Sequence, residues 1–408
     1  MTQTQAGHGL ESDDAAGAVT TFDHLDPELN YERLQQVYRG LNSGCPVPKT
    51  TAHGGYALVT RYDDVIEVEK DAKTFSSASG VLHPPHEGRP PSIPIEFDGA
   101  EHIAYRKLFM EVLSAPRVRK LLPYLEGLTE RMLDGFAAGD ETDFVQNVAV
   151  QIPVRAVGHL LGLGEDANEM IQAFATKILE NAGTPAMVEA LQELDVEAAR
   201  YFGERRDNPG DDYLSRLVHM DFGGRKLTDD ELKNIFRTFV FAGFETTAHA
   251  IGSLVHHVVS DPDLQAGMRS GAIPLEGVVE EGLRMLPPVQ TMFRTTTSPT
   301  TLNGSDLSAG ERLVLLYAVA NRDPAQFEDA ESFCPNRVNP RQHVTFGIGP
   351  HYCAGATLAR AEIHVLLKAL LNRPPLELVG EPRHNPHLMM GQMMGIDYLP
   401  VRFQEGPC

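Results

Sequence analysis

Cysteine is scarce in this chain of 408 residues, and the four that it contains are Cys45, Cys334, Cys353 and Cys408. None lies in a Cys-x-x-Cys pair, and so few cysteines in so long a chain argue against a disulfide framework. No cysteines and histidines cluster in the way that a structural zinc site requires. This cysteine usage is typical of a cytoplasmic protein.

Basic residues are also few, with 35 Lys and Arg against 56 Asp and Glu and a formal net charge of -21. Such an acidic surface disfavours nucleic acid and anionic membranes as partners. No bilayer span is expected, because the most apolar segment, residues 235–259, contains Arg237, Glu245 and three histidines. The N-terminal residues lack the basic start and apolar centre of a signal peptide.

Helical periodicity dominates the rest of the chain, over residues 27–41 and from about 101 to about 263. Short strand-like segments occur at 56–60, 295–302 and 312–319. The sequence therefore predicts a mainly α fold with a minor β part.

The interior contains no linker-like segment and no repeat of fixed period. We expect residues 25–408 to form a single domain behind a flexible N-terminal tail at 1–24. The five prolines in residues 81–94 exclude a helix or an inner strand there. Irregular loops of this length inside a compact domain are often functional.

One long helix is predicted from Thr228, where Thr228 and Glu231 have the spacing of a capping box, to Ser260. A helix of ~32 residues would be ~48 Å long and would cross a whole domain. Its middle is apolar nearly all round, apart from Glu245 and Thr246, which cost free energy there unless they are paired or used.

Residues 346–355 form a glycine-rich turn in which Cys353 directly precedes a predicted helix over 354–371. The N-terminus of a helix stabilises a thiolate and lowers the pKa of the thiol, which suits an axial ligand to iron. From these residues alone an inert buried cysteine is also possible, as is a nucleophile, although a nucleophile needs a nearby His and Asn.

Residues 346–360 resemble the haem-binding signature of cytochromes P-450, Phe-x-x-Gly-x-[His/Arg]-x-Cys-x-Gly followed by Leu-Ala-Arg, with every fixed position present. The resemblance extends over about 25–403. It implies a cytochrome P-450 fold whose long central helix lies over haem b (iron protoporphyrin IX), with O₂ as co-substrate. It makes Cys353 the metal ligand, and it gives His351 a propionate contact. Phe346 and Gly355 join them in the cofactor site.

Residues 242–247 match the family motif [Ala/Gly]-Gly-x-[Asp/Glu]-Thr-[Thr/Ser], which opens the central helix locally. By resemblance, Thr246 is the hydroxyl that hydrogen-bonds dioxygen and its waters, and Glu245 is the acid that relays protons from solvent. The residues themselves leave another interpretation open. Thr246 could bond back to a carbonyl one turn earlier, and Glu245 could form a buried ion pair.

Three further cations match family positions that hold the haem propionates, namely His102, Arg106 and Arg294.

A charged pair on a later predicted helix, Glu281 and Arg284, lies on one helical face. Alone it is indistinguishable from a surface pair worth ~0–1 kcal/mol. The resemblance implies a buried structural ion pair with Arg337 as its third partner, although Cys334 stands where the family usually has Asp.

The substrate pocket is assigned by family position to the loop 81–94, the central helix, residues 289–293 and the turn 387–394. The predicted lining residues are Val240, Phe241, Phe244, Val289, Gln290, Met292, Met390 and Met393. The methionines indicate a soft apolar wall, or else ordinary core. An apolar small molecule is expected, and terpenoids, small aromatics, steroids and fatty acids all remain open.

The chain has no room for a reductase module, so we expect no flavin in it and a separate ferredoxin as electron donor. A basic cluster that suits an acidic ferredoxin consists of Arg106, Lys107, Arg117, Arg119 and Lys120. The resemblance thus implies a monomeric monooxygenase. The alternatives are a haem-thiolate peroxygenase and a non-catalytic haem sensor, and Glu245 with Thr246 argues against both.

Overall fold

The computed structural model describes residues 19–42, 47–85, 89–136 and 139–405, so Cys45 and Cys408 lie outside it. The helices are α1 (Tyr31–Asn42), α2 (Tyr62–Lys70), α3 (Gly99–Leu113), α4 (Ala115–Asp134), α5 (Gln151–Leu161), α6 (Ala167–Glu180), α7 (Pro185–Asp207), α8 (Tyr213–His219), α9 (Asp229–Ala242), α10 (Glu245–Ser260), α11 (Pro262–Ser270), α12 (Leu275–Met285), α13 (Tyr317–Ala320), α14 (Ala356–Leu371) and α15 (Leu388–Gly391). A π-helical turn, η2, spans Val145–Ala149. Within the described ranges, no helix combines the length and the apolar character needed to cross a lipid bilayer.

The strands are short and few, as expected. They are β1 (Val19–Thr20), β2 (Lys49–Thr50), β3 (Tyr56–Val59), β4 (Phe75–Ser76), β5 (Thr142–Asp143), β6 (Thr291–Thr296), β7 (Thr300–Leu302), β8 (Ser305–Leu307), β9 (Arg312–Leu316), β10 (Leu376–Leu378), β11 (Arg383–His387), β12 (Met393–Tyr398) and β13 (Pro400–Phe403). The predicted fold class, mainly α with a minor β part, is confirmed.

The main sheet has six strands in the order β1-β2-β3-β9-β6-β4, with β3 parallel to β9 and β9 antiparallel to β6. Along β3, Tyr56 and Leu58 pack into one apolar cluster while Ala57 and Val59 pack into another. The centre of the sheet is therefore buried on both faces. Three smaller pairings complete the β part, namely β10-β13-β5, β11-β12 and β7-β8.

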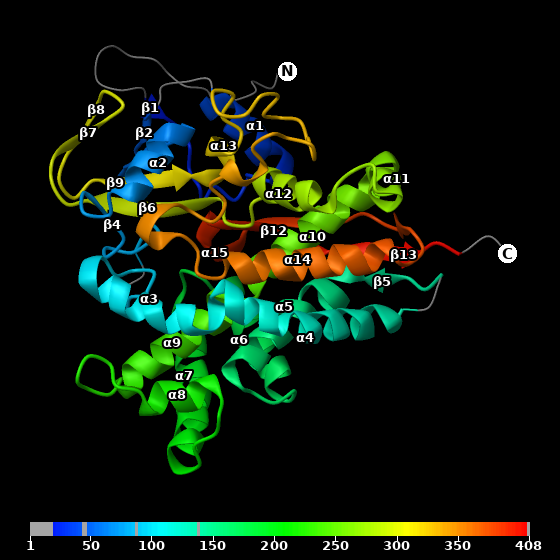
Figure 1. Ribbon diagram of the computed structural model, residues 1–408. Coiled ribbons are helices and arrows are strands. Elements are labelled where there is room, and N and C mark those ends of the chain that lie inside the picture. Colours follow the sequence, from blue (N-terminus) through cyan, green and yellow to red (C-terminus); the bar gives the residue numbers. More distant parts are fainter. Residues whose placement is uncertain (1–18, 43–46, 86–88, 137–138, 406–408) are drawn as a thin grey trace.

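The six-stranded sheet lies toward one end of the molecule, and most of the longer helices lie away from it (Figure 1). The sheet lies beside α1 and α2, and α7, α8 and α9 lie at the opposite end. Between these ends, α10 packs against α5, α12, α14 and β12. The central helix thereby meets the helix that follows Cys353.

The start of the central helix is the capping box that the sequence predicts. Thr228 Oγ1 accepts from the Glu231 N–H at 3.2 Å, and the Glu231 carboxylate accepts from the Thr228 N–H at 2.7 Å. The prediction of one unbroken helix from 228 to 260 is wrong, because α9 ends at Ala242 and α10 begins at Glu245.

The break lies at Gly243 and Phe244, where the resemblance implies a local opening. A Cβ at Gly243 would lie 2.4 Å from the Phe239 carbonyl oxygen and 2.8 Å from Val157 Cγ2. The next residue, Phe244, leaves helical geometry with a φ of -124°. Glycine is therefore required for the close approach of α5 to the end of α9.

Two predictions concern irregular segments. The proline-rich loop is confirmed where it is described, because 81–85 and 89–94 contain neither helix nor strand. The predicted tail at 1–24 is too long, since β1 pairs with β2 and the side chains of Phe22 and His24 are buried. His24 bonds the Tyr56 hydroxyl at 2.9 Å, which fixes this segment to the sheet. Residues 1–18 lie outside the described ranges.

Candidate functional site

A cavity lies between the break in the central helix and the loop that carries Cys353. Thr246 of α10 and Cys353 both line it. Most of the remaining wall is apolar and includes Phe109, Val157 and Leu358. Two motifs separated by about a hundred residues of sequence therefore share one enclosed space.

The loop before α14 is shaped to present the Cys353 thiol. The Cys353 N–H donates to the Phe346 carbonyl at 2.8 Å, and the Cys353 carbonyl accepts from the Ala356 N–H at 3.3 Å. Gly349 has a φ of 71°, and a Cβ there would lie 2.6 Å from the Glu69 carbonyl oxygen. The loop thus closes on the first turn of α14 and packs tightly against α2.

The sequence predicts a lowered pKa for the Cys353 thiol, and in the chain alone its surroundings shift that pKa in both directions. The Cys353 side chain is exposed toward the cavity, but the protein around it displaces bulk water and raises the pKa of the thiol, while hydrogen bonds from the backbone of Gly355 and Ala356 and the charges of Arg106 and Arg360 lower it. A metal ion bound by the sulfur reverses this balance, because a coordinating thiol is deprotonated.

The four side chains predicted to hold propionates, His102, Arg106, Arg294 and His351, all line the cavity. The rings of His102 and His351 lie in contact, with centroids 4.2 Å apart and planes inclined at 39°. Burial and the neighbouring His351 and Arg106 lower the pKa of His102 to about 4. A protonated His102 is therefore disfavoured beside His351 and Arg106, and a bound anion would relieve that repulsion.

Two carboxylates that the sequence analysis missed pair with these cations. Arg294 Nη2 donates to Glu69 Oε1 at 2.7 Å, and His351 Nε2 lies 3.1 Å from Asp98 Oδ1. The hydroxyl of Tyr317 also donates to Glu69, at 2.7 Å. These carboxylates fix the orientation of Arg294 and His351. No local signal marks them, since Glu69 lies on α2 and Asp98 precedes α3.

The arrangement fits a haem. The fit rests on one thiol in the wall, an apolar lining for the macrocycle, and four basic side chains for its propionates. Cys353 would hold the iron, and His102, Arg106, Arg294 and His351 would face the propionates.

The acid–alcohol pair occupies the first turn of α10. The Thr246 hydroxyl lines the cavity and donates to the Ala242 carbonyl at 3.1 Å, across the helix break. Glu245 Oε2 lies 3.4 Å from His249 Nε2, and both side chains are buried. The contacts that the residues alone allow are therefore both present. His249 was missed, although its i+4 spacing from Glu245 was a usable signal.

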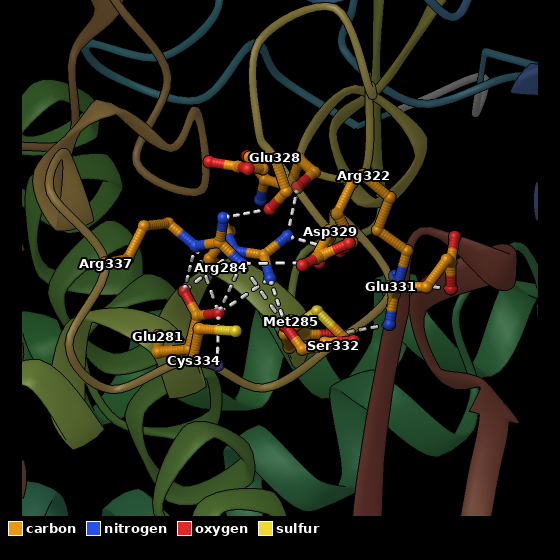
Figure 2. Close-up of polar contacts among 12 residues, drawn as sticks. Glu281, Arg284, Met285, Arg322, Glu328, Asp329, Glu331, Ser332, Cys334 and Arg337 are labelled. Carbon is orange, nitrogen blue, oxygen red and sulfur yellow. Dashed lines mark hydrogen bonds and ion pairs between the residues drawn. The ribbon is translucent and has the colours of Figure 1, made fainter.

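The predicted buried ion pair is present with all three partners (Figure 2). Glu281 and Arg284 are fully buried and bond twice, at 2.8 and 2.7 Å. Arg337 Nη2 donates to the same carboxylate at 3.1 Å, and the Cys334 N–H donates to it at 2.8 Å. A backbone N–H thus binds Glu281 at the position where the family usually has Asp, so that departure leaves the network intact.

The predicted substrate wall is only partly supported by the geometry. A second cavity adjoins the first, and Phe241, Val289, Met292 and Met393 line one or both. Four predicted residues line neither cavity, namely Val240, Phe244, Gln290 and Met390.

Each of these four has a physical reason to lie elsewhere. Val240 of α9 and Phe244 of the helix break are fully buried in the main apolar core. Gln290 donates to the Pro287 carbonyl, and Met390 packs over Gly183. Met389 of the predicted turn 387–394 does line the second cavity. The sequence analysis missed other lining residues, and these include Ile95, Val157, Leu160 and Thr238.

Comparison with known proteins agrees with this geometry. The family model for cytochrome P-450 matches residues 155–271 and 274–396. A steroid C26-monooxygenase of Mycobacterium tuberculosis is 30% identical over 382 residues, which cover 91% of this chain and 94% of the relative. Mycinamicin IV hydroxylase/epoxidase of Micromonospora griseorubida is 33% identical over 335 residues, with 80% and 83% covered.

A solved structure gives the same result for the fold. The crystal structure of CYP108D1 from Novosphingobium aromaticivorans matches with a TM-score of 0.81 at 29% identity, covering 92% of this chain and 95% of that one. The chain therefore belongs to the cytochrome P-450 family and is a monooxygenase of that family.

Proposed function

We propose that this chain inserts one atom of O₂ into an apolar small molecule, with haem b held by Cys353 and electrons supplied by a separate ferredoxin and its reductase. The observation that carries the proposal is the meeting of Cys353 and Thr246 on one apolar cavity. A bound haem with a thiolate ligand supplies the activation of O₂. The chain itself supplies binding, orientation and protons.

Proton delivery is assigned to Glu245 and Thr246. The reaction consumes protons inside a cavity with a mostly apolar wall, so a side chain must carry them there. Thr246 lies in the cavity wall, and Glu245, which directly precedes it, is the first residue of α10. His249 Nε2 lies 3.4 Å from the Glu245 carboxyl, one turn further along the helix.

The electron donor is assigned to the surface beside Cys353. Exposed cations of α3 and α4 lie there, namely Lys107, Arg117, Arg119 and Lys120. Arg106 donates to the Tyr352 carbonyl, which connects this surface to the residue before Cys353. The apolar side chains of Ile103 and Tyr352 are exposed beside the cations. Cations around an apolar centre suit a small acidic protein.

The test has two parts. First, the reduced protein with bound CO should have the Soret position characteristic of thiolate-ligated haem, and Cys353→His should lose it. Second, NADH with a ferredoxin and its reductase should support product formation, whereas hydrogen peroxide alone should not replace them. Retention of the thiolate band in Cys353→His would overturn the assignment of the ligand. Turnover with peroxide alone would favour a peroxygenase.

A further inference from the structure

The second cavity has charged groups in its wall that are separate from those assigned to the haem. The two cavities share Thr238, Thr246 and Met292 as lining residues, so they adjoin. The second is also lined by Arg89 and Arg237. A substrate that extends from Thr246 into this space therefore meets guanidinium groups.

Arg89 is already committed to protein partners. Its guanidinium makes two bonds to the Glu96 carboxylate, at 2.5 and 2.7 Å, and a third to Ser92 Oγ at 2.8 Å. Glu96 accepts two more bonds, from the N–H groups of Val81 and Ser92 at 3.0 and 2.7 Å. The pair of Arg89 and Glu96 holds the proline-rich loop in its conformation. Most of the hydrogen-bonding groups of both side chains are therefore already used and cannot bind a ligand.

Arg237 has that capacity. Its side chain is 13% exposed, and its one polar partner among the described residues is Asp195, with Nε 3.3 Å from Oδ1. That contact lacks hydrogen-bond geometry, since Asp195 Oδ1 is buried without a hydrogen-bond partner there. A guanidinium has five N–H donors, so most of its donors remain unused.

The charges around Arg237 favour an anion. Burial lowers the pKa of Arg237 more than the charge of Asp195 raises it, and the charge of Arg89 lowers it further. Burial likewise raises the pKa of Asp195. The charge of Arg237 in the cavity wall is therefore only partly compensated by the Asp195 carboxylate. The nearby carboxylates of Asp195 and Glu96 would repel a doubly charged phosphate more strongly than a singly charged anion.

The position of Arg237 along the central helix sets a length. Thr246 lies nine positions after Arg237, beyond the break at Gly243 and Phe244. An unbroken α-helix would place them about 14 Å apart along its axis, which gives the scale of their separation. A ligand that contacts both residues needs an apolar body of about that length. A planar carboxylate at its far end matches the fork of the guanidinium.

We propose that Arg237 anchors the carboxylate of an otherwise apolar monocarboxylic acid, whose remote end lies beside Thr246. The inference rests on the proposed function and narrows its substrate class. It makes Arg237 a determinant of specificity. Asp195 is then a competitor that holds Arg237 in place until the acid binds.

The test compares dodecanoic acid with methyl dodecanoate, because the two differ mainly in charge at one end. Binding is measured on the ferric haem-loaded protein, from the spectral change when water leaves the iron. The acid should bind at least about tenfold more tightly than the ester to the parent protein. Arg237→Gln should abolish this preference, Arg237→Lys should keep part of it, and Asp195→Asn should increase it.

Controls separate this proposal from the proposed function. Imidazole should bind the iron equally in all variants, and each should retain the thiolate band with CO. Loss of that band from the parent would contradict the haem assignment instead. With the band and imidazole binding intact, equal affinity for acid and ester in the parent would overturn the role of Arg237. An unchanged preference in Arg237→Gln, or no spectral change with either ligand, would overturn it equally.

Discussion

At the scale of single residues, Thr246 and Glu245 each have a structural contact in addition to the role proposed for them. Thr246 satisfies the Ala242 carbonyl at the helix break, and Glu245 lies against His249 in a buried pair. The imidazole lies so close to β12 that a Cβ on Gly395 would be 2.0 Å from its Nδ1. Substitutions at Thr246 or Glu245 can therefore change stability as well as catalysis, so both must be measured.

Thr246→Ala should keep the haem and the substrate but separate NADH consumption from product formation. The variant lacks the hydroxyl that orders water in the cavity. Protons are then delivered without the correct position, and hydrogen peroxide is released in place of product. Thr246→Ser restores a hydroxyl and should recover most of the coupling. The measurements are NADH consumed, peroxide released and product formed. Unchanged coupling in Thr246→Ala would exclude a role in proton delivery.

Glu245→Gln should slow turnover by about 10²-fold, within the usual range for general acid catalysis. The amide keeps a polar group opposite His249 but cannot carry a proton. Coupling should be better preserved than in Thr246→Ala, because the cavity hydroxyl remains. The check is the rate of product formation at saturating ferredoxin. A rate equal to that of the parent would mean that Glu245 serves only its ion pair.

At the scale of elements, the molecule places irregular backbone where the site needs it and holds it with buried bonds. The break between α9 and α10 opens the cavity, and the loop before α14 turns at Gly349 against α2. The network around Glu281 and Arg284 ties α12 to the segment after α13, since Arg284 also donates to the carbonyls of Asn321 and Ala330 at 2.7 Å. These restraints position both walls of the cavity.

Gly243→Ala should destabilise the protein by ~1–3 kcal/mol through overpacking. In an ordinary helix interior the same change would stabilise by about 1 kcal/mol. The sign reverses here because the new Cβ would meet the Phe239 carbonyl and Val157. Gly203→Ala on α7 is the matched control, since nothing lies within 4 Å of its Cβ position, and it should stabilise. The measurement is the thermal unfolding temperature of the two haem-loaded variants, which should fall for Gly243→Ala and rise for Gly203→Ala.

Glu281→Ala should give little haem-loaded protein, because it leaves Arg284 buried without its carboxylate at a cost of ~3–5 kcal/mol. Glu276→Ala is the control, because Glu276 pairs with Arg341 at the surface, where both side chains are more than half exposed. That variant should match the parent. The measurement is the haem content of the soluble fraction. A normal content for Glu281→Ala would show that the buried network is dispensable.

At the scale of the whole molecule, the net charge of -21 contrasts with the local cluster of cations on α3 and α4. α4 packs along α14, the helix that follows Cys353, and the proposed function makes this cluster the docking face for the electron donor. Electrons then have a short path from a docked partner. Such an arrangement steers an acidic partner to one face of an otherwise acidic surface.

Reversing two of these charges, in Arg117→Glu with Lys120→Glu, should raise the KM for ferredoxin on the order of tenfold at low ionic strength. The kcat at saturating ferredoxin should change little, because neither side chain touches the cavity. Added salt should shrink the difference through screening. Arg39→Glu on α1, an exposed cation away from this face, is the control. Equal effects from both changes would point to net charge instead of a docking site.

The sequence by itself determined the features that are contiguous in the chain. The cysteine loop, the capping box at Thr228 and the acid–alcohol pair each occupy a few neighbouring residues, so their identity and spacing carry the signal. The alternation and periodicity of apolar residues likewise fixed the balance of helix and strand. The helix break was within reach through Gly243, although periodicity alone predicts an unbroken helix.

Only the tertiary structure decided what meets across the chain. Glu69 and Arg294 are 225 residues apart, and Asp98 and His351 are 253 apart, so no local pattern links them. The cavity wall likewise depends on how α5, α9 and α10 are rotated against one another, which turned Val240 and Phe244 into core and Val157 and Thr238 into lining. The same packing placed Arg237 beside Asp195. Helix rotation is set by the summed packing of many side chains, and a single sequence does not reveal that sum.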